Sequence, residues 1–235
     1  MMSTDQLRSL TSAQISALEI EDIQILSTAQ ISNLYASQIG SMTSDQFISL
    51  STDQTQALTT NQIRGIKTLQ MAVITSNQAM SLSTDQLQML TTAQLTAMTT
   101  ESLAALDSDQ IASLSTDQFS SLTSLQLAGL TTLQFSSIGT TQLSVLSGSQ
   151  IQAIETEDIV ALDSNLLNLA SNQFKLLNTA QMSALTTDQL SSLTSSHLGL
   201  LSATQIGSIT TAGLKAITTT QLSYLTYTQL KALRT

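Results

Sequence analysis

The sequence predicts an all-α fold, an α-solenoid in which about 29 short helices wind into a superhelical rod. Three observations lead to this prediction. The 235 residues repeat with a period of eight, most repeats begin with a Ser/Thr-x-x-Gln motif, and apolar residues recur at the fifth and eighth positions of each repeat. Such motifs start helices, and stacked short helices bury a shared apolar face.

The repeat accounts for nearly the whole chain. Twenty eight-residue units, which we call octads, run from residue 3 to residue 162. A seven-residue unit covers 163–169, and eight further octads run from 170 to 233. We number octad positions 1 to 8, with Ser3 at position 1 of the first octad. Because the pattern leaves no room for a second fold, we predict a single repeat domain over 1–235.

Each octad carries the signals of a helix N-terminus. Position 1 is mostly Ser or Thr, and position 4 is Gln in 23 of the 28 octads. In a capping box, the side chain at each of these positions accepts a hydrogen bond from the backbone N–H of the other. Asp at position 3 then lies in the first turn, where negative charge is favourable. The predicted structural caps include Gln6, Gln14, Gln86, Gln94, Gln110, Gln118, Gln189 and Gln221.

The apolar positions predict the core. Position 8 is Leu, Ile or Met in all 28 octads, and position 5 is apolar in all but one, where it is Thr55. Residues three apart share one face of a helix but lie on opposite faces of a strand. One unbroken helix does not fit, because eight residues advance by about 800° and the apolar face drifts. Predicted core residues include Leu10, Leu18, Leu90, Leu106, Leu114, Leu122, Leu193 and Leu225.

A few units depart from the pattern. Position 4 is not Gln in five octads, and we expect His197, one of the five, to form the same cap. The seven-residue unit 163–169 omits one residue and carries Leu where Gln is expected. We interpret it as a phase slip that kinks the rod, or as a junction or docking point. The other four substituted positions are Asp22, Ser102, Asp158 and Gly213.

The composition disfavours catalysis and cofactor binding. The chain has no Cys and a single His, which argues against a zinc site and a catalytic triad. A net charge of -9 has the wrong sign for binding nucleic acid. The acidic segments 19–22 and 155–158 offer oxygen ligands for Ca²⁺, but helix capping explains them and no calcium loop accompanies them. We expect no enzyme and no cofactor.

The sequence also bears on location. The first residues lack a basic and apolar signal segment, and no stretch approaches the roughly 18 apolar residues of a membrane span. We therefore expect a soluble chain without membrane insertion. It would reach the cell exterior or surface by a route without an N-terminal signal peptide, or alternatively stay in the cytoplasm.

The terminal octads suggest self-association. Solenoids usually end in atypical repeats with a polar outer face, yet the first and last octads here resemble interior ones. Asp5 and the acidic segment 19–22 lie near one end of the sequence, and Lys215, Lys231 and Arg234 lie near the other. We predict that copies of the chain stack head to tail into a filament, since such a contact does not close on itself.

The run LTTAQLTAMTTESLAALDSDQIASLSTDQFSSL, from Leu90 to Leu122, resembles the "LTTxQLxxL" arrays of some large bacterial surface and secreted proteins. This resemblance implies a bacterial structural or adhesive role. The alternative function is a binding module or scaffold, which would take a protein partner or bind ice through rows of Thr and Ser. Against ice binding, Ser replaces Thr freely, which a lattice-matched surface would resist.

Overall fold

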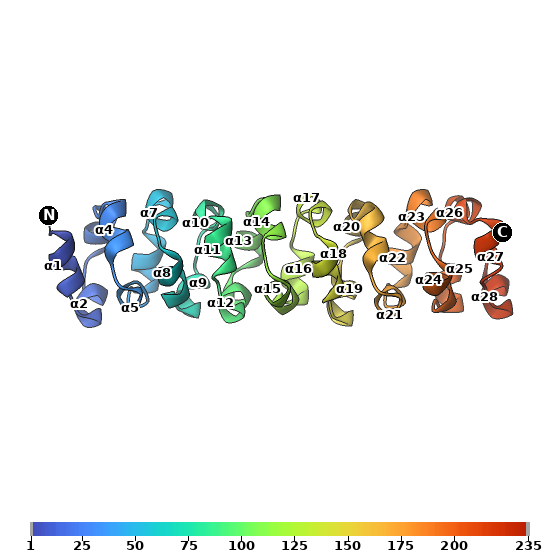
Figure 1. Cartoon of the computed structure of the whole chain (residues 1–235), viewed down its shortest axis with the longest axis horizontal. Coiled ribbons are helices and arrows are strands. Elements are labelled where there is room, and N and C mark those ends of the chain that lie inside the picture. The colour runs from blue at the N-terminus through green and yellow to red at the C-terminus, as the bar shows by residue number, and fades with distance from the viewer. Residues whose placement is uncertain (1, 234–235) are drawn as a thin grey trace. The chain divides into compact units, whose positions relative to one another are not determined.

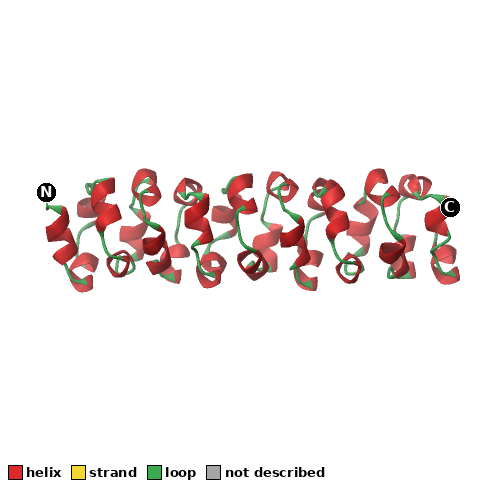
Figure 2. Ribbon diagram, viewed as in Figure 1, coloured by secondary structure: helices red, strands yellow, loops and turns green. Residues whose placement is uncertain are grey.

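The computed structural model describes residues 2–233, and all regular structure in this range is helical (Figures 1 and 2). It comprises 28 short α-helices and one 3₁₀ helix, η1. The prediction of an all-α solenoid with about 29 short helices is therefore confirmed. The chain forms two compact units whose boundary lies between Gly129 and Leu130. We describe each unit separately.

The first unit contains sixteen helices, each of four to six residues. Their bounds are α1 Thr4–Ser9, α2 Ser12–Ser16, α3 Ile20–Gln24, α4 Thr28–Asn33, α5 Ala36–Ile39, α6 Ser44–Ile48, α7 Thr52–Gln56, α8 Thr60–Gly65, α9 Thr68–Met71, α10 Ser76–Ser81, α11 Thr84–Gln88, α12 Thr92–Ala97, α13 Thr100–Ala104, α14 Ser108–Ala112, α15 Thr116–Ser121 and α16 Ser124–Ala128.

The second unit continues the same series through the seven-residue segment. The bounds are α17 Thr132–Ser136, α18 Thr140–Ser144, α19 Gly148–Ala153, α20 Thr156–Ala161, η1 Asp163–Asn168, α21 Ser171–Phe174, α22 Thr179–Ala184, α23 Thr187–Ser191, α24 Ser195–Gly199, α25 Ala203–Gly207, α26 Thr211–Ala216, α27 Thr219–Leu222 and α28 Tyr227–Ala232.

Local hydrogen bonds explain where each helix starts and stops. Thr91, which precedes α12, has extended backbone, and its Oγ1 accepts from the Gln94 N–H at 3.2 Å. In return, Gln94 Oε1 accepts from the Thr91 N–H at 2.7 Å. At the other end of a helix, a position-7 serine often donates to the position-4 carbonyl, as Ser113 does to Gln110 at 2.7 Å. The sequence thus confines each helix to less than two turns.

Helices three repeats apart in the chain pack against each other within each unit. Examples are α5 with α8 and α10 with α13 in the first unit, and α17 with α20 and α25 with α28 in the second. The α5–α8 contact requires glycine, because a Cβ on Gly65 would lie 2.6 Å from the Ala36 carbonyl oxygen. Small residues beside the apolar stripe therefore allow successive turns of the solenoid to approach closely.

The core consists of the residues at positions 5 and 8. Position-5 side chains are buried in every octad from Leu7 to Ile206. Thr55 also lies inside, because its hydroxyl donates to the Ser51 carbonyl at 2.9 Å and leaves no unpaired donor. Of the eight leucines predicted as core, six are buried. Leu10 and Leu18 are only half-buried, which corrects that prediction, because no earlier turn of described repeats covers them.

The seven-residue unit keeps the register of the surrounding repeats. Leu166 and Leu169 are buried where positions 5 and 8 are expected. Asn165 therefore occupies position 4, and its Nδ2 donates to the Ile138 carbonyl at 3.4 Å. The sequence prediction placed Leu at this position and was wrong, because the omitted residue lies at the start of the unit. Asp163 there adopts a positive φ of 46°, a region that Asp tolerates better than most residues.

Candidate functional site: the glutamine ladder and the end faces

The position-4 glutamines connect turns of the solenoid in a repeated arrangement, which we call the glutamine ladder. Gln62 is buried, and its Oε1 accepts from the Thr59 N–H at 2.7 Å. Its Nε2 donates to the carbonyls of Ile31 and Leu34, at 2.8 and 2.7 Å. These carbonyls belong to the octad four repeats earlier. One carboxamide therefore closes the start of its own helix and the end of another.

The ladder recurs in the second unit. Gln229 Nε2 donates to the carbonyls of Leu198 and Leu201, at 2.9 and 2.8 Å. Across the seven-residue unit the sequence separation shortens by one, yet Gln181 still reaches Ile151 and Ile154 four repeats earlier, at 2.8 and 2.7 Å. A ladder glutamine such as Gln181 therefore pairs with the fourth repeat before its own, even where one of the intervening repeats is a residue shorter.

Sequence analysis found only half of this role. All eight predicted capping glutamines form capping boxes with the position-1 residue. The donation to carbonyls one turn away was missed. The signal was in the sequence: a capping box accepts Glu as well as Gln at its last position. Position 4 contains 23 Gln and no Glu, which indicates that the side chain must also donate.

Asp158 occupies the ladder position in α20, where its carboxylate cannot donate. The side chain is buried and hydrogen-bonds the Thr132 hydroxyl. Burial raises the pKa of this carboxyl, the Thr132 bond opposes the rise, and the nearby Glu155 and Glu157 charges add to it. The charged form of Asp158 therefore destabilises the second unit near neutral pH.

His197 reproduces both halves of a ladder glutamine. Its Nδ1 accepts from the Thr194 N–H at 3.3 Å, as the sequence predicted. The ring also donates to the Leu169 carbonyl four repeats earlier, and because Nδ1 accepts, the donor is Nε2. Burial lowers the pKa of His197, and the bond to Leu169 partly offsets this. The ring of Phe174 lies 5.0 Å away, centroid to centroid.

The two remaining substitutions inside the ladder leave different spaces. Gly213 in α26 has no side chain, and Leu190 fills the space, since a Cβ on Gly213 would lie within 2.5 Å of Leu190 Cδ1. Ser102 in α13 is too short to fill the space of a glutamine, and a cavity of about 370 Å³ opens beside it. The first departure in the chain, Asp22, is exposed and accepts from the Glu19 N–H at 3.4 Å.

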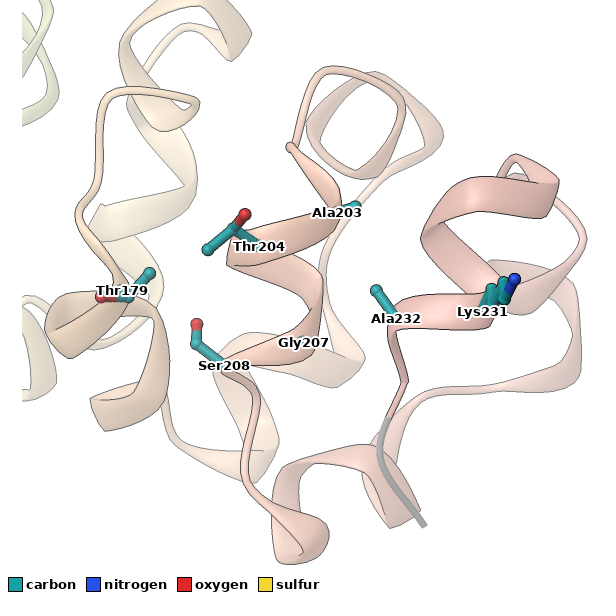
Figure 3. Close-up of a pocket in the computed structure, with 7 residues that line it drawn as sticks. All are labelled: Thr179, Ala203, Thr204, Gly207, Ser208, Lys231 and Ala232. Atoms are coloured by element: carbon teal, nitrogen blue, oxygen red, sulfur yellow. The ribbon is translucent and has the colours of Figure 1, made fainter.

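One groove of the second unit crosses three helices, α22, α25 and α28. Its volume is about 600 Å³, and small side chains form most of its walls. Figure 3 shows Thr204 and Ser208 on the side of α25 toward Thr179, and Gly207 facing Ala232. A Cβ on Gly207 would lie 2.9 Å from the Ala232 carbonyl oxygen. No group of catalytic side chains converges here.

The acidic segments lie at the starts of helices and show no grouping of metal ligands among the described residues. Among residues 2–233, no three His, Cys, Asp or Glu side chains are grouped so that they would hold a metal ion. The segments 19–22 and 155–158 each provide the start of a helix, α3 and α20. Searching the same residues finds no helix with the length and apolar character that crossing a membrane requires.

The first and last turns of described repeats expose opposite parts of the pattern. The N-terminal end face, which we define as Gln6, Leu10, Gln14 and Leu18, exposes ladder glutamines and half-buried position-8 leucines. Within residues 2–233 the Nε2 atoms of Gln6 and Gln14 have no acceptor.

The C-terminal end face exposes the position-5 leucines of the last three octads. Leu214 and Leu222 are half-buried and Leu230 is exposed. The position-8 carbonyls of Ile217 and Leu225 accept no hydrogen bond from the described chain. Lys215 and Lys231 lie in the same repeats, whereas Arg234 lies outside the described residues. We include the three leucines and two carbonyls in this end face.

Comparison with known families gives the repeat a name. The family pattern described as the ALTTAQ repeat matches residues 15–52 and 87–124. These two segments carry ALTTAQ repeats. The letters of the name correspond to positions 7, 8, 1, 2, 3 and 4 of successive octads, and the run from Leu90 to Gln94 matches the last five of them. The expected resemblance to short-helix octapeptide arrays is thus confirmed. No curated protein matches the chain.

The ladder predicts a cost for losing the amide donor in an ALTTAQ repeat. Gln94→Glu keeps the shape and the capping acceptor but turns a carboxylate toward the Ile63 and Ile66 carbonyls. We expect a loss of about 2–3 kcal/mol in the free energy of unfolding, measured by chemical denaturation at pH 7. The control is Gln6→Glu, where Nε2 has no acceptor and the cap is retained, and a comparable loss there would contradict the role of the ladder.

Restoring the amide at the ladder position of α20, which Asp158 occupies, should stabilise the chain. Asp158→Gln removes a buried charge and supplies the missing donor, so we expect a gain of about 1–2 kcal/mol at pH 7. Because the folded-state pKa of Asp158 lies above its usual 3.8, the gain should shrink as the pH falls through that folded value. Exposed Asp188→Gln is the matched control, and an equal gain there would refute the argument.

His197 should make the second unit sensitive to mild acid. Its folded pKa lies below the ordinary 6.5, so the unfolded chain binds the proton more readily. Stability conferred by the neutral ring is present above about 6.5 and is lost as the pH falls through the folded value. The free energy of unfolding of the wild type relative to His197→Gln should therefore decrease in this window. Parallel pH curves for the two proteins would exclude the effect.

Proposed function

We propose that the chain is a non-enzymatic structural repeat protein that assembles head to tail into a filament. The observation that supports this proposal is the complementarity of the two end faces. One presents unused amide donors and position-8 leucines, and the other presents unused carbonyl acceptors and position-5 leucines. In the interior of each unit these same groups are partnered or buried.

The interior of the solenoid defines how such faces would join. Apart from Leu233 in the last octad, which is half-buried, position-8 leucines lack cover only where no earlier repeats are described, and position-5 leucines lack cover only where no later repeats are described. A second copy placed after Leu233 would supply both. In the four-repeat register, its Gln14 lies opposite the carbonyls of Leu214 and Ile217. Burial of partly exposed leucines would supply the driving force, and the amides would fix the register.

Charge favours the same orientation. Asp5 lies in α1 and Glu21 in α3, which Glu19 precedes, whereas Lys215 and Lys231 lie in α26 and α28. Opposite charges would therefore meet in a head-to-tail contact and repel in head-to-head or tail-to-tail contacts. Because a head-to-tail contact leaves a free face at each end, addition continues and produces a fibre.

The location of the filament is part of this proposal. The similarity to arrays of bacterial surface and secreted proteins supports a place outside the cell or on its surface. A protein surface rich in hydroxyls suits such exposure: Ser and Thr each number 36 in the chain. Fractionation of cells that produce the protein, followed by immunodetection, tests the location independently of assembly.

Assembly should be visible in purified protein and sensitive to one end-face residue. Negative-stain electron microscopy and light scattering over a concentration series should show fibres that lengthen with concentration. Leu18→Lys places a charge in the contact, so we expect it to raise the concentration needed for assembly by about tenfold or more. Leu125→Lys is the matched control, because Leu125 is 73% exposed and lies outside both end faces.

Two results would contradict the proposal. The first is a wild-type protein that stays monomeric at every concentration, salt and pH tested. The second is a wild-type fibre that Leu18→Lys and Leu125→Lys weaken equally, because the contact would then lie elsewhere. Circular dichroism of both variants checks that the helices persist.

A further inference from the structure

The cavity at Ser102 has the chemistry of a missing side chain. In an intact octad of the first unit such as that of Gln86, the amide accepts from the position-1 N–H at 2.7 Å. It donates to carbonyls at positions 6 and 8 of the octad four repeats earlier, here Gln56 and Leu58, at 3.0 and 2.6 Å. Gln110 uses the same two positions, whereas glutamines such as Gln94 donate to positions 5 and 8.

Of the three backbone groups that correspond to those around Gln86, Ser102 bonds only the position-8 carbonyl. Its hydroxyl donates to the Ile74 carbonyl at 2.7 Å and accepts from Thr99 Oγ1 at 3.0 Å. The Thr99 N–H, which would donate to a glutamine Oε1, has no acceptor within residues 2–233. The Ala72 carbonyl, at the position-6 site, has no donor in the same part of the chain. Thus the Thr99 N–H, which an intact ladder amide would accept from, and the nearby Ala72 carbonyl have no partner in the described chain.

The space for that amide is open. The cavity of about 370 Å³ is lined by residues 72–76 of the α9–α10 segment and by Thr99, Glu101 and Ser102. It therefore includes both residues that carry the unused groups. Gly213 shows the alternative outcome, in which a neighbouring leucine occupies the vacated space. At Ser102 no side chain has moved in, so the position remains accessible from the surface.

We propose that the Ser102 cavity is a binding site for a primary carboxamide. The ligand carbonyl accepts from the Thr99 N–H, and its NH₂ group donates to the Ala72 carbonyl, as a ladder glutamine would. A primary amide fits because it carries an acceptor and a donor on one planar group. A carboxylate lacks the donor, and a tertiary amide lacks it too. The amide belongs either to a small molecule or to a Gln or Asn side chain of a partner polypeptide.

Propionamide is the probe for the first test. In ¹⁵N-labelled full-length protein, propionamide should produce saturable chemical-shift changes at the amides of Thr99 and Val73. N,N-dimethylpropionamide, which has no N–H, should produce none. Ser102→Gln fills the cavity with the residue's own amide, so we expect propionamide affinity to fall at least tenfold. Absence of saturable shifts, or equal responses to both compounds, would overturn the proposal.

A gain-of-site variant keeps the test decisive if Ser102→Gln folds poorly. Gln86→Ser opens a gap in α11 with acceptors at the same positions, 6 and 8, so propionamide should produce new saturable shifts at Ser83 in that variant alone. Failure to create a site there, together with an undiminished response in Ser102→Gln, would refute the assignment.

The source of the amide is tested with capped Gly-Gln-Gly and Gly-Glu-Gly peptides. Tighter binding of the Gln peptide than of propionamide supports a partner polypeptide, and weaker binding supports a small molecule. Equal binding of the Gln and Glu peptides would count against an amide site.

Discussion

The structure depends on the carboxamide of the position-4 glutamine, whose oxygen and nitrogen both form hydrogen bonds with the backbone. An interior ladder glutamine such as Gln62 accepts at the start of its own helix and donates to carbonyls four repeats earlier, at distances of 2.7 and 2.8 Å. Helices this short do not persist alone in water, because the cost of nucleation is recovered only over longer segments. Here the amide and the adjacent apolar pair supply the missing stabilisation, so local capping and long-range packing cannot be separated.

Much of this arrangement was predictable. The period, the capping box and the apolar pair at positions 5 and 8 determine the helix boundaries and the core, because each depends on neighbours within one octad. The long-range half of the ladder was not predicted, since it depends on the number of repeats per turn. That number depends on how residues such as Gly65 and Ala36 pack between turns. The absence of Glu from position 4 was the sequence signal for this long-range hydrogen bond.

The substituted ladder positions show how one site tolerates different chemistry. His197 keeps both hydrogen bonds through its imidazole ring. Asp158 cannot donate a hydrogen bond to the carbonyls, and its side chain is buried away from solvent. At Gly213 the neighbouring Leu190 takes the space, and at Ser102 the space stays open. Sequence alone marked all four as departures but did not distinguish them. The distinction depends on which neighbours lie one turn away and whether they are large enough to move in.

The seven-residue unit has a consequence for how such arrays change over time. Asn165 takes the place of the ladder amide there, and Gln181 still contacts the repeat four units earlier although one residue is missing. Duplication or loss of a whole unit would therefore present each amide with an equivalent set of carbonyls. Genes encoding these arrays can lengthen or shorten by recombination between their repeated segments, and the products need no compensating mutations elsewhere to fold.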